Sequence, residues 1–134
     1  MTSLCLRCAK VYVDNWVSQM LHEGVIYRHI VLTMPAMLRK TFYQQAKAML
    51  SPFMRCGVRC LDDCCSRVSG RTLQGGYSMV VQTHGRNGQY NPHLHIIATS
   101  RGWDPQARQW VHLDYLPYTL LRKKWQWHLL TMLH

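Results

Sequence analysis

Two apolar segments with only a short polar connection between them constrain the fold of this chain more than any other feature. They are YSMVVQT, residues 77–83, and HLHIIAT, residues 93–99, and the connection GRNGQYNP, residues 85–92, is rich in glycine and asparagine. This pattern is typical of two strands joined as a hairpin-like pair. Because no helix separates these strands and the helical patterns lie elsewhere, the sequence predicts an α+β fold with an antiparallel sheet.

Further strands and helices are expected on either side of this pair. Residues 25–34 alternate and are rich in β-branched side chains, which predicts a third strand. A short strand is expected at residues 109–113. Apolar residues at steps of three and four predict a short amphipathic helix at residues 9–21 and a final helix that follows Pro117.

A helical region is also expected between the third strand and the hairpin-like pair. It would begin at Pro35, in the first helical position (N1), with Thr33 as a candidate N-cap. Pro52 is expected to break this region into two helices, because proline lacks the backbone N–H that a helix interior needs. The second helix would end near Val68, and the polar, glycine-rich residues 69–76 are expected to form a loop.

The charge of the chain indicates a polyanionic partner. Its 134 residues include 16 Lys and Arg against 6 Asp and Glu, a formal net charge of +10, and nucleic acid is the commonest partner of so basic a domain. No apolar run is long enough for a membrane-spanning helix, and the N-terminus lacks the pattern of a secretory signal. We therefore expect one domain at most, without membrane association, in the reducing cytoplasm.

His93 and His95 are the first candidates for a functional site. Residues two apart in a strand point to the same face, with Cα atoms about 7 Å apart, so the two imidazoles can bind one metal ion. A third ligand can come from the neighbouring strand, where Gln82 and His84 share a face. The strand register does not choose between these two. The alternative is that the histidines line the polar face of a half-exposed sheet.

The cysteines suggest one partial metal site and one packing stripe. Cys5 and Cys8 form a Cys-x-x-Cys pair before a predicted helix, which is the form of half a zinc knuckle. Four more cysteines lie on one predicted helix, at Cys56, Cys60, Cys64 and Cys65. Spacing by four places three of them on one helix face, where thiols are more often buried packing than a ligand set.

The carboxylates do not form a catalytic pair. Glu23 is the only glutamate, and the five aspartates are dispersed. Asp62 and Asp63 are adjacent on a predicted helix and are expected to face solvent. General acid–base chemistry by paired carboxylates is therefore not expected. The sequence HGRNG also lacks the lysine and the spacing of a nucleotide-binding turn.

A basic cluster with aromatic neighbours begins the last predicted helix. Arg122, Lys123 and Lys124 are followed by Trp125 and Trp127, a set that can pair phosphates and stack bases of single-stranded nucleic acid. The alternative, which we favour for the tryptophans, is that they pack inward while the charges face water. The residues expected to contact DNA are the three basic residues of this cluster, Arg122, Lys123 and Lys124, together with Arg86 and Arg101.

Taken together, the chain resembles the rolling-circle transposases of the insertion-sequence-91 type, within the His-hydrophobic-His (HUH) superfamily of single-strand DNA endonucleases. The segments that carry the resemblance are CLRCAKVYVDNWV, HIVLTMPAMLRKTFY, VVQTHGRNGQYNPHLHIIATSRG and LRKKWQWHLL. The long third segment is the specific one. There the family reads roughly leucine-His-Thr-x-Gly followed by His-Pro-His-x-His.

The resemblance implies a divalent metal ion, Mg or Mn, held by His93 and His95 with a third ligand from the neighbouring strand. The family's histidine on that strand falls on Gln82, whose amide oxygen can still bind a metal, so the resemblance favours Gln82 over His84. Asn91 is a further departure, since the family often has histidine there. The implied activity is nicking and strand transfer of single-stranded DNA, in which a tyrosine attacks a phosphate and the metal stabilises the developing charge.

The nucleophilic tyrosines of the family form a Tyr-x-x-x-Tyr pair that this chain does not contain. Tyr115 and Tyr118 are three apart, and neither is assigned the role. The resemblance therefore implies a fragment, with residues 1–22 the remnant of a zinc-binding region plus a helix and residues 23–134 a partial HUH domain. Zinc is expected at the Cys-x-x-Cys pair if its other half is present, and the setting is prokaryotic and nucleoid-associated.

Two other classes of function compete with this interpretation. One is a basic DNA-binding module without catalysis, or an inactive transposase remnant, in which the histidines are structural. The other is a histidine-triad nucleotide hydrolase, which needs a third histidine two residues after His95. Position 97 is Ile97, which counts strongly against that class.

Overall fold

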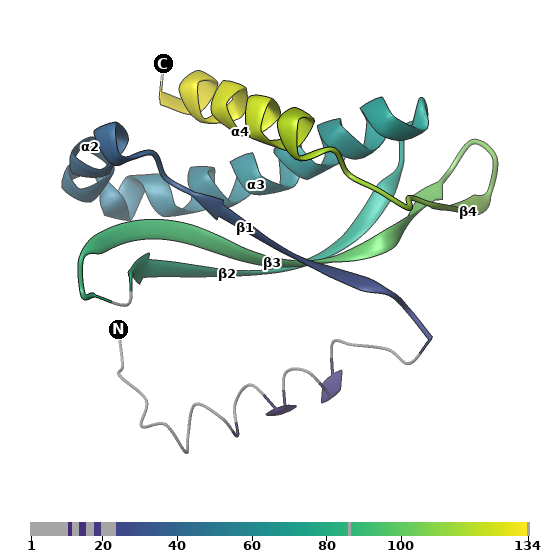
Figure 1. Cartoon of the computed structure of the whole chain (residues 1–134), viewed down its shortest axis with the longest axis horizontal. Coiled ribbons are helices and arrows are strands. Elements are labelled where there is room, and N and C mark those ends of the chain that lie inside the picture. Colours follow the sequence, from purple (N-terminus) through teal and green to yellow (C-terminus); the bar gives the residue numbers. More distant parts are fainter. Residues whose placement is uncertain (1–10, 12–13, 16–17, 20–23, 86, 134) are drawn as a thin grey trace.

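The computed structural model describes residues 11, 14–15, 18–19, 24–85 and 87–133 of the chain. Its helices lie over one face of an antiparallel sheet, so the fold has two layers (Figure 1). In chain order the elements are β1 (Tyr27–Thr33), η1 (Ala36–Leu38), α2 (Arg39–Gln44), α3 (Ala46–Ser69), β2 (Gln74–His84), β3 (Tyr90–Asp104), β4 (Gln109–His112) and α4 (Tyr118–Leu133). The predicted α+β class and antiparallel sheet are confirmed.

The long strand β3 forms the centre of the sheet. It pairs with β2 along one edge and with β1 and then β4 along the other, and all three pairings are antiparallel. The connection from β2 to β3 is closed by a hydrogen bond from Gly85 N to Gln89 O (2.9 Å). Gly88 in this connection has φ 77°, a left-handed conformation that glycine adopts without steric cost. The two segments that we expected to pair therefore do so through a tight polar turn.

The hydrophobic core lies between the sheet and the helices α3 and α4. Alternate residues of β3 point into it, and Leu94 and Ile96 are fully buried there. On the helix side they meet a cluster that includes Phe53 of α3 and Trp125 of α4, whose rings lie 5.6 Å apart. Burial of each such side chain stabilises the fold by at most about 1.5–3 kcal/mol. The core thus fixes which face of β3 remains outside.

Helices α3 and α4 are joined by the cysteine stripe and by a charged contact. Cys56, Cys60 and Cys64 are buried between the layers, so the packing prediction for them is confirmed. Asp63 accepts hydrogen bonds from Lys124 Nζ (3.1 Å) and His128 Nε2 (3.2 Å) of α4.

Asp62 and Asp63 are half-buried and hydrogen-bonded, so the prediction that they face solvent holds only in part. Asp62 accepts a hydrogen bond from the hydroxyl of Tyr77 on β2 at 2.7 Å, and Asp63 has its partners on α4. These partners lie far away in the sequence. Helical periodicity alone therefore could not reveal them.

Two predictions about helix ends were wrong. Pro52 lies inside the continuous helix α3, and the break falls at Gln45, whose backbone (φ −123°, ψ 26°) leaves the helical region. Thr33 is the last residue of β1 and caps nothing, since Pro35 precedes the first helical turn without a side-chain hydrogen bond. The predicted end of α3 near Val68 is confirmed, with Gly70 in a left-handed cap after Ser69.

The helix predicted at residues 9–21 falls largely outside the described residues. Among the helices that are described, none is long and apolar enough to cross a membrane.

Candidate metal and single-strand site

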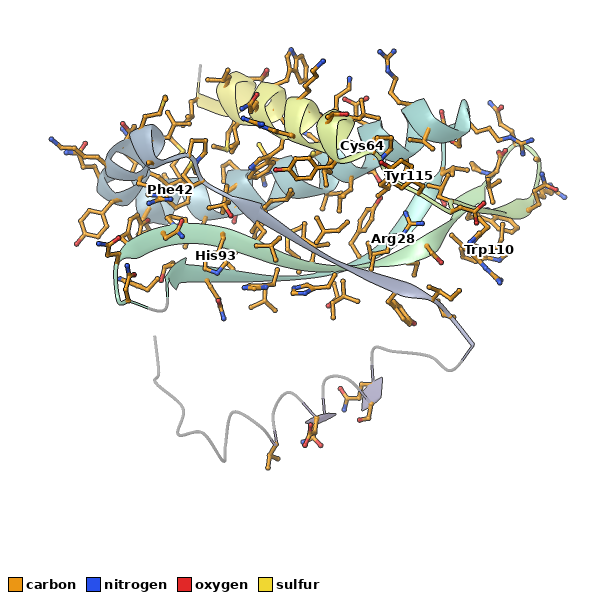
Figure 2. The ribbon with its side chains drawn as sticks, viewed as in Figure 1. Arg28, Phe42, Cys64, His93, Trp110 and Tyr115 are labelled. Carbon is orange, nitrogen blue, oxygen red and sulfur yellow. The ribbon has the colours of Figure 1, made fainter. Side chains whose placement is uncertain are left out.

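The predicted histidine pair lies on the face of the sheet that the helices leave uncovered. Leu94 and Ile96 point into the core, so the alternation of β3 directs His93 and His95 to the opposite face. Figure 2 shows His93 on the side of the sheet that faces away from α3 and α4. We call this surface the open face. The expectation that the two imidazoles project together is met, since their ring centroids lie 4.9 Å apart.

Gln82 completes a cluster of three donor atoms with the two histidines. It lies on β2 directly opposite His93 in the strand pairing. Its Oε1 lies 2.9 Å from His93 Nε2 and 3.0 Å from His95 Nε2. One oxygen and two ring nitrogens thus converge on a single point of the open face.

The hydrogen bond of the other ring nitrogen fixes the tautomer of His93. Its Nδ1 lies 2.7 Å from the backbone oxygen of Asn91. A carbonyl oxygen only accepts, so Nδ1 carries a hydrogen, and in the tautomer with a single ring hydrogen the Nε2 lone pair is directed at Gln82 Oε1. Two acceptors then face each other at 2.9 Å, a repulsive contact that a cation or a rotated amide relieves. Histidines that bind metals almost always donate their second ring N–H in this manner.

A third histidine, His29 of β1, supports the pair from the side. Its Nε2 lies 3.0 Å from His95 Nδ1, and the two rings are nearly parallel with centroids 5.2 Å apart. We did not predict this residue. The alternation of residues 25–34 does place it on one face with Thr33. Its approach to His95 depends on the pairing of β1 with β3, in which His29 lies opposite Ile97.

The environment of His95 favours the neutral imidazole. Burial lowers the pKa of His95 below its ordinary value of 6.5, and repulsion from His93 and His29 lowers it further. A neutral ring has a lone pair available for a metal ion, whereas a protonated ring has none. The lowered pKa of His95 therefore keeps its ring in the form that can act as a metal ligand.

Two separations define the donor cluster: Gln82 Oε1 lies 2.9 Å from His93 Nε2 and 3.0 Å from His95 Nε2. Separations of this size are those of ordinary hydrogen bonds. In the described part of the chain no group of three His, Cys, Asp or Glu side chains is placed to hold a metal. The candidate set therefore depends on an amide oxygen as its third member.

His84, the other candidate for the third position, points elsewhere. A shift in strand register separates it from Gln82: Gln82 pairs with His93, whereas His84 pairs with Tyr90, so the extra residue of β3 moves His84 out of line with the histidine pair. Its Nδ1 lies 2.9 Å from Thr83 Oγ1, and its ring packs against the ring of Tyr90 with centroids 5.6 Å apart. The structure thus brings Gln82, and not His84, to the histidine pair.

The expected DNA-contacting residues fall in different places. Arg101 is exposed on β3, and Arg122 and Lys123 are exposed on α4. Lys124 is held in the ion pair with Asp63, so its charge is partly neutralised. The other predicted site residues, Arg86, Cys5 and Cys8, lie outside the described part of the chain.

A cavity lies between α4 and the β1 edge of the open face. It has a volume of about 260 Å³ and is lined in part by Tyr118 and Arg122 of α4 and by Thr33, the residue opposite His93. Trp125 is buried beneath it and donates its indole N–H to Thr33 O (3.0 Å). Trp127 is 58% exposed, so the expectation of an inward tryptophan holds for Trp125 alone.

Comparison with known proteins supports a relationship to transposases. A family model described as "Putative transposase" matches residues 76–134, the part that contains the whole donor cluster. The chain is 26% identical to the "Transposase for insertion sequence element IS801" of Pseudomonas savastanoi pv. phaseolicola over 125 residues, 92% of the chain and 29% of that protein. It is 25% identical to "Putative transposase y4qJ" of Sinorhizobium fredii over 124 residues, 89% of the chain and 31% of that protein.

None of the solved structures matches the chain. The chain spans about three tenths of the length of the curated relatives it matches. Over most of its own length it is similar to transposases.

Proposed function

We propose that the chain is an HUH-type endonuclease part of a transposase, which binds single-stranded DNA and a divalent metal ion on its open face. The observation that carries this proposal is the convergence of His93 Nε2, His95 Nε2 and Gln82 Oε1 at separations of 2.9 and 3.0 Å. The implied reaction is the nicking and transfer of a single DNA strand. The tyrosine step of that reaction is assigned to no residue of this chain.

The residues around the donor atoms prepare them for a cation. Asn91 O and His29 Nε2 each hold the Nδ1 side of one imidazole, which orients both rings before any ligand arrives. When bound, the metal would supply charge stabilisation to a scissile phosphate. Arg101 and Arg122 are the exposed cations proposed to attract the strand toward the site.

Gln82 would serve the protein both with and without the metal. Its amide oxygen is a metal ligand, while rotation of the amide by 180° would place two N–H donors against the two Nε2 atoms. The metal-free site would then be satisfied as well, at the cost of one side-chain rotation. An amide binds a divalent ion more weakly than a carboxylate does, because it carries no charge. Two imidazoles with one amide oxygen also favour Mn²⁺ over Mg²⁺, which prefers oxygen ligands and retains its water.

Titration of the 134-residue chain with Mn²⁺, followed by electron paramagnetic resonance of the free ion, tests this proposal. Saturable binding of one ion per chain is expected. The combined substitution His93→Ala and His95→Ala should abolish it. Gln82→Leu should weaken it at least about tenfold, and Gln82→Glu should strengthen it because the third ligand gains a charge. The matched control is His84→Ala, which removes a nearby exposed imidazole and should change nothing.

The competing interpretation is a basic DNA-binding module whose histidines are structural. It predicts that the wild-type chain and the double histidine variant bind Mn²⁺ equally poorly while both bind single-stranded DNA. That result would contradict the metal site. Equal loss of Mn²⁺ binding in the His84→Ala variant would contradict the assignment of Gln82 as the third ligand.

A further inference from the structure

An apolar cavity lies at the far end of the open face from the histidine pair. It has a volume of about 420 Å³ and is lined by Val25, Tyr27, Thr99, Arg101 and Trp110. Its lining is almost entirely apolar apart from the guanidinium of Arg101. Trp110 is 60% exposed, which is unusual for the largest apolar side chain.

The cavity and the metal-donor cluster belong to the same face of the sheet. Thr99 and Arg101 follow His93 and His95 in the same alternating row of β3. Tyr27 is in the same row of β1 as His29. Six residues separate His95 from Arg101, which corresponds to about 20 Å along the strand. A nucleic-acid strand with bases about 3.4 Å apart covers that distance with about six nucleotides, and an extended strand needs fewer.

The walls of the cavity are held in place by neighbouring residues. The ring of Trp110 packs edge-on against the ring of Trp103, its direct partner across β3 and β4, with centroids 5.4 Å apart. Thr99 Oγ1 accepts a hydrogen bond from Gly76 N (3.1 Å) and donates one to Arg101 O (2.8 Å). Figure 2 places Trp110 at the end of the sheet that lies away from His93. An exposed ring in a fixed orientation can stack a ligand with little further loss of freedom.

We propose that this cavity holds one unpaired base of the DNA strand whose phosphate lies at the histidine cluster. The indole of Trp110 would stack the base, and the guanidinium of Arg101 would pair a neighbouring phosphate. The occupant must come from a single strand, because the faces of bases in a duplex are already stacked on one another. The basic charge of the chain and of the cavity rim favours a nucleic acid over a lipid or an apolar peptide. This assignment rests on the proposed function and adds a second contact point to it.

Fluorescence anisotropy of a labelled single strand of about 12 nucleotides tests the assignment, within the usual site size for such proteins. Trp110→Ala should weaken binding by about 5- to 100-fold, the range expected for loss of one stacked base. The matched control is Tyr43→Ala, because Tyr43 is an aromatic residue exposed to a similar degree (65%) but lies on α2 in the helix layer. It should leave the affinity unchanged.

A strand of equal length and charge that lacks all its bases separates stacking from charge. Trp110→Ala should have no effect on binding of this abasic strand, whereas Arg101→Gln should weaken binding of both strands. Equal effects of Trp110→Ala on the two strands would overturn the base pocket. Dimerisation of the wild-type chain through Trp110 would also overturn it. Analytical ultracentrifugation would then show a dimer for the wild type and a monomer for Trp110→Ala.

The two proposals fail in different ways. If the wild-type chain binds no single-stranded DNA, the proposed function itself fails. If it binds the strand and Mn²⁺ normally but Trp110→Ala has no effect, only the base pocket fails.

Discussion

At the scale of single residues, the ability of the candidate site to bind a metal depends on which ring nitrogens of His93 and His95 carry hydrogen. The Nδ1 hydrogen of His93 is fixed by Asn91 O, so its Nε2 lone pair is directed at Gln82. His95 has a lowered pKa, first because it is buried and then because His93 and His29 are near. The unfolded chain releases His95 from this environment. Proton binding at this one ring is therefore linked both to metal binding and to folding.

The sign of this linkage predicts how stability changes with pH. His95 has a pKa below 6.5 when folded and about 6.5 when unfolded, so the unfolded chain binds more protons between the two values. Stability from this group is complete above about pH 6.5 and is lost as the pH falls through the folded pKa. Urea unfolding at pH 7.5 and 5.5, compared between wild type and His95→Gln, measures the effect. The wild type should lose more stability on acidification, and equal losses would contradict the assigned environment of His95.

Sequence reasoning reached some residues of this site and missed others for a physical reason. Alternation within one strand is enough to place His93 and His95 together. Gln82 came from a family resemblance, and a register shift that no local pattern reveals removed His84 from consideration. His29 was missed because its neighbours are set by the pairing of two strands that are more than 60 residues apart.

At the scale of elements, Gly57 of α3 packs closely against the sheet behind the histidine pair. A Cβ added to Gly57 of α3 would lie 2.8 Å from Leu94 Cδ1 and 3.1 Å from Met79 Cε. Leu94 is fully buried and separates the two histidines in the sequence. A shift of the Leu94 backbone would therefore move both candidate metal ligands, which are its neighbours in β3.

Gly57→Ala should consequently disturb both packing and metal binding. Alanine improves helix propensity by about 1 kcal/mol, but overpacking of a closed core costs about 1–3 kcal/mol. A net loss of about 1 kcal/mol is expected in urea unfolding, together with weaker Mn²⁺ binding. Gly70→Ala is the control, because its left-handed cap (φ 69°) lies outside the core and no atom lies within 4 Å of the added Cβ. It should cost stability and leave Mn²⁺ binding intact.

The elements themselves were more predictable than their ends. The hairpin-like pair could be recognised because two segments rich in β-branched residues enclose a connection too polar and too rich in glycine to form a helix. Strand β3 runs on to Asp104, beyond the predicted end at residue 99, because β4 pairs with residues 101–104. That stretch contains glycine and aspartate, which disfavour strands locally. Likewise Pro52 does not break α3, since the loss of one backbone hydrogen bond is offset by packing of the neighbouring Phe53 in the core.

At the scale of the whole molecule, the helix layer stabilises the sheet, and the proposed function assigns binding to the opposite face. The helices cover one face of the sheet and are joined to each other through Asp63, Lys124 and the buried cysteines. The other face carries the histidine cluster and the cavity beside Trp110. A strand that follows this face also passes the cavity at the edge of β1, where Arg122 of α4 lies beside Thr33. The net charge of +10 would thus act in two ways: the whole chain attracts a polyanion, and cations such as Arg122 attract it to defined positions along the open face.

The salt dependence of DNA binding distinguishes attraction by cations at defined positions from attraction by the total charge. Each phosphate that a protein cation neutralises on a single strand contributes about 0.7 to the slope of log affinity against log salt concentration. Arg122→Gln should lower the slope by about 0.7, because this exposed cation lies at the edge of the open face. Lys124→Gln should leave the slope nearly unchanged and lower stability by up to about 1 kcal/mol, because Lys124 already pairs with Asp63 at 3.1 Å. Equal changes of slope in the two variants would mean that only total charge matters and would contradict a defined path across the open face.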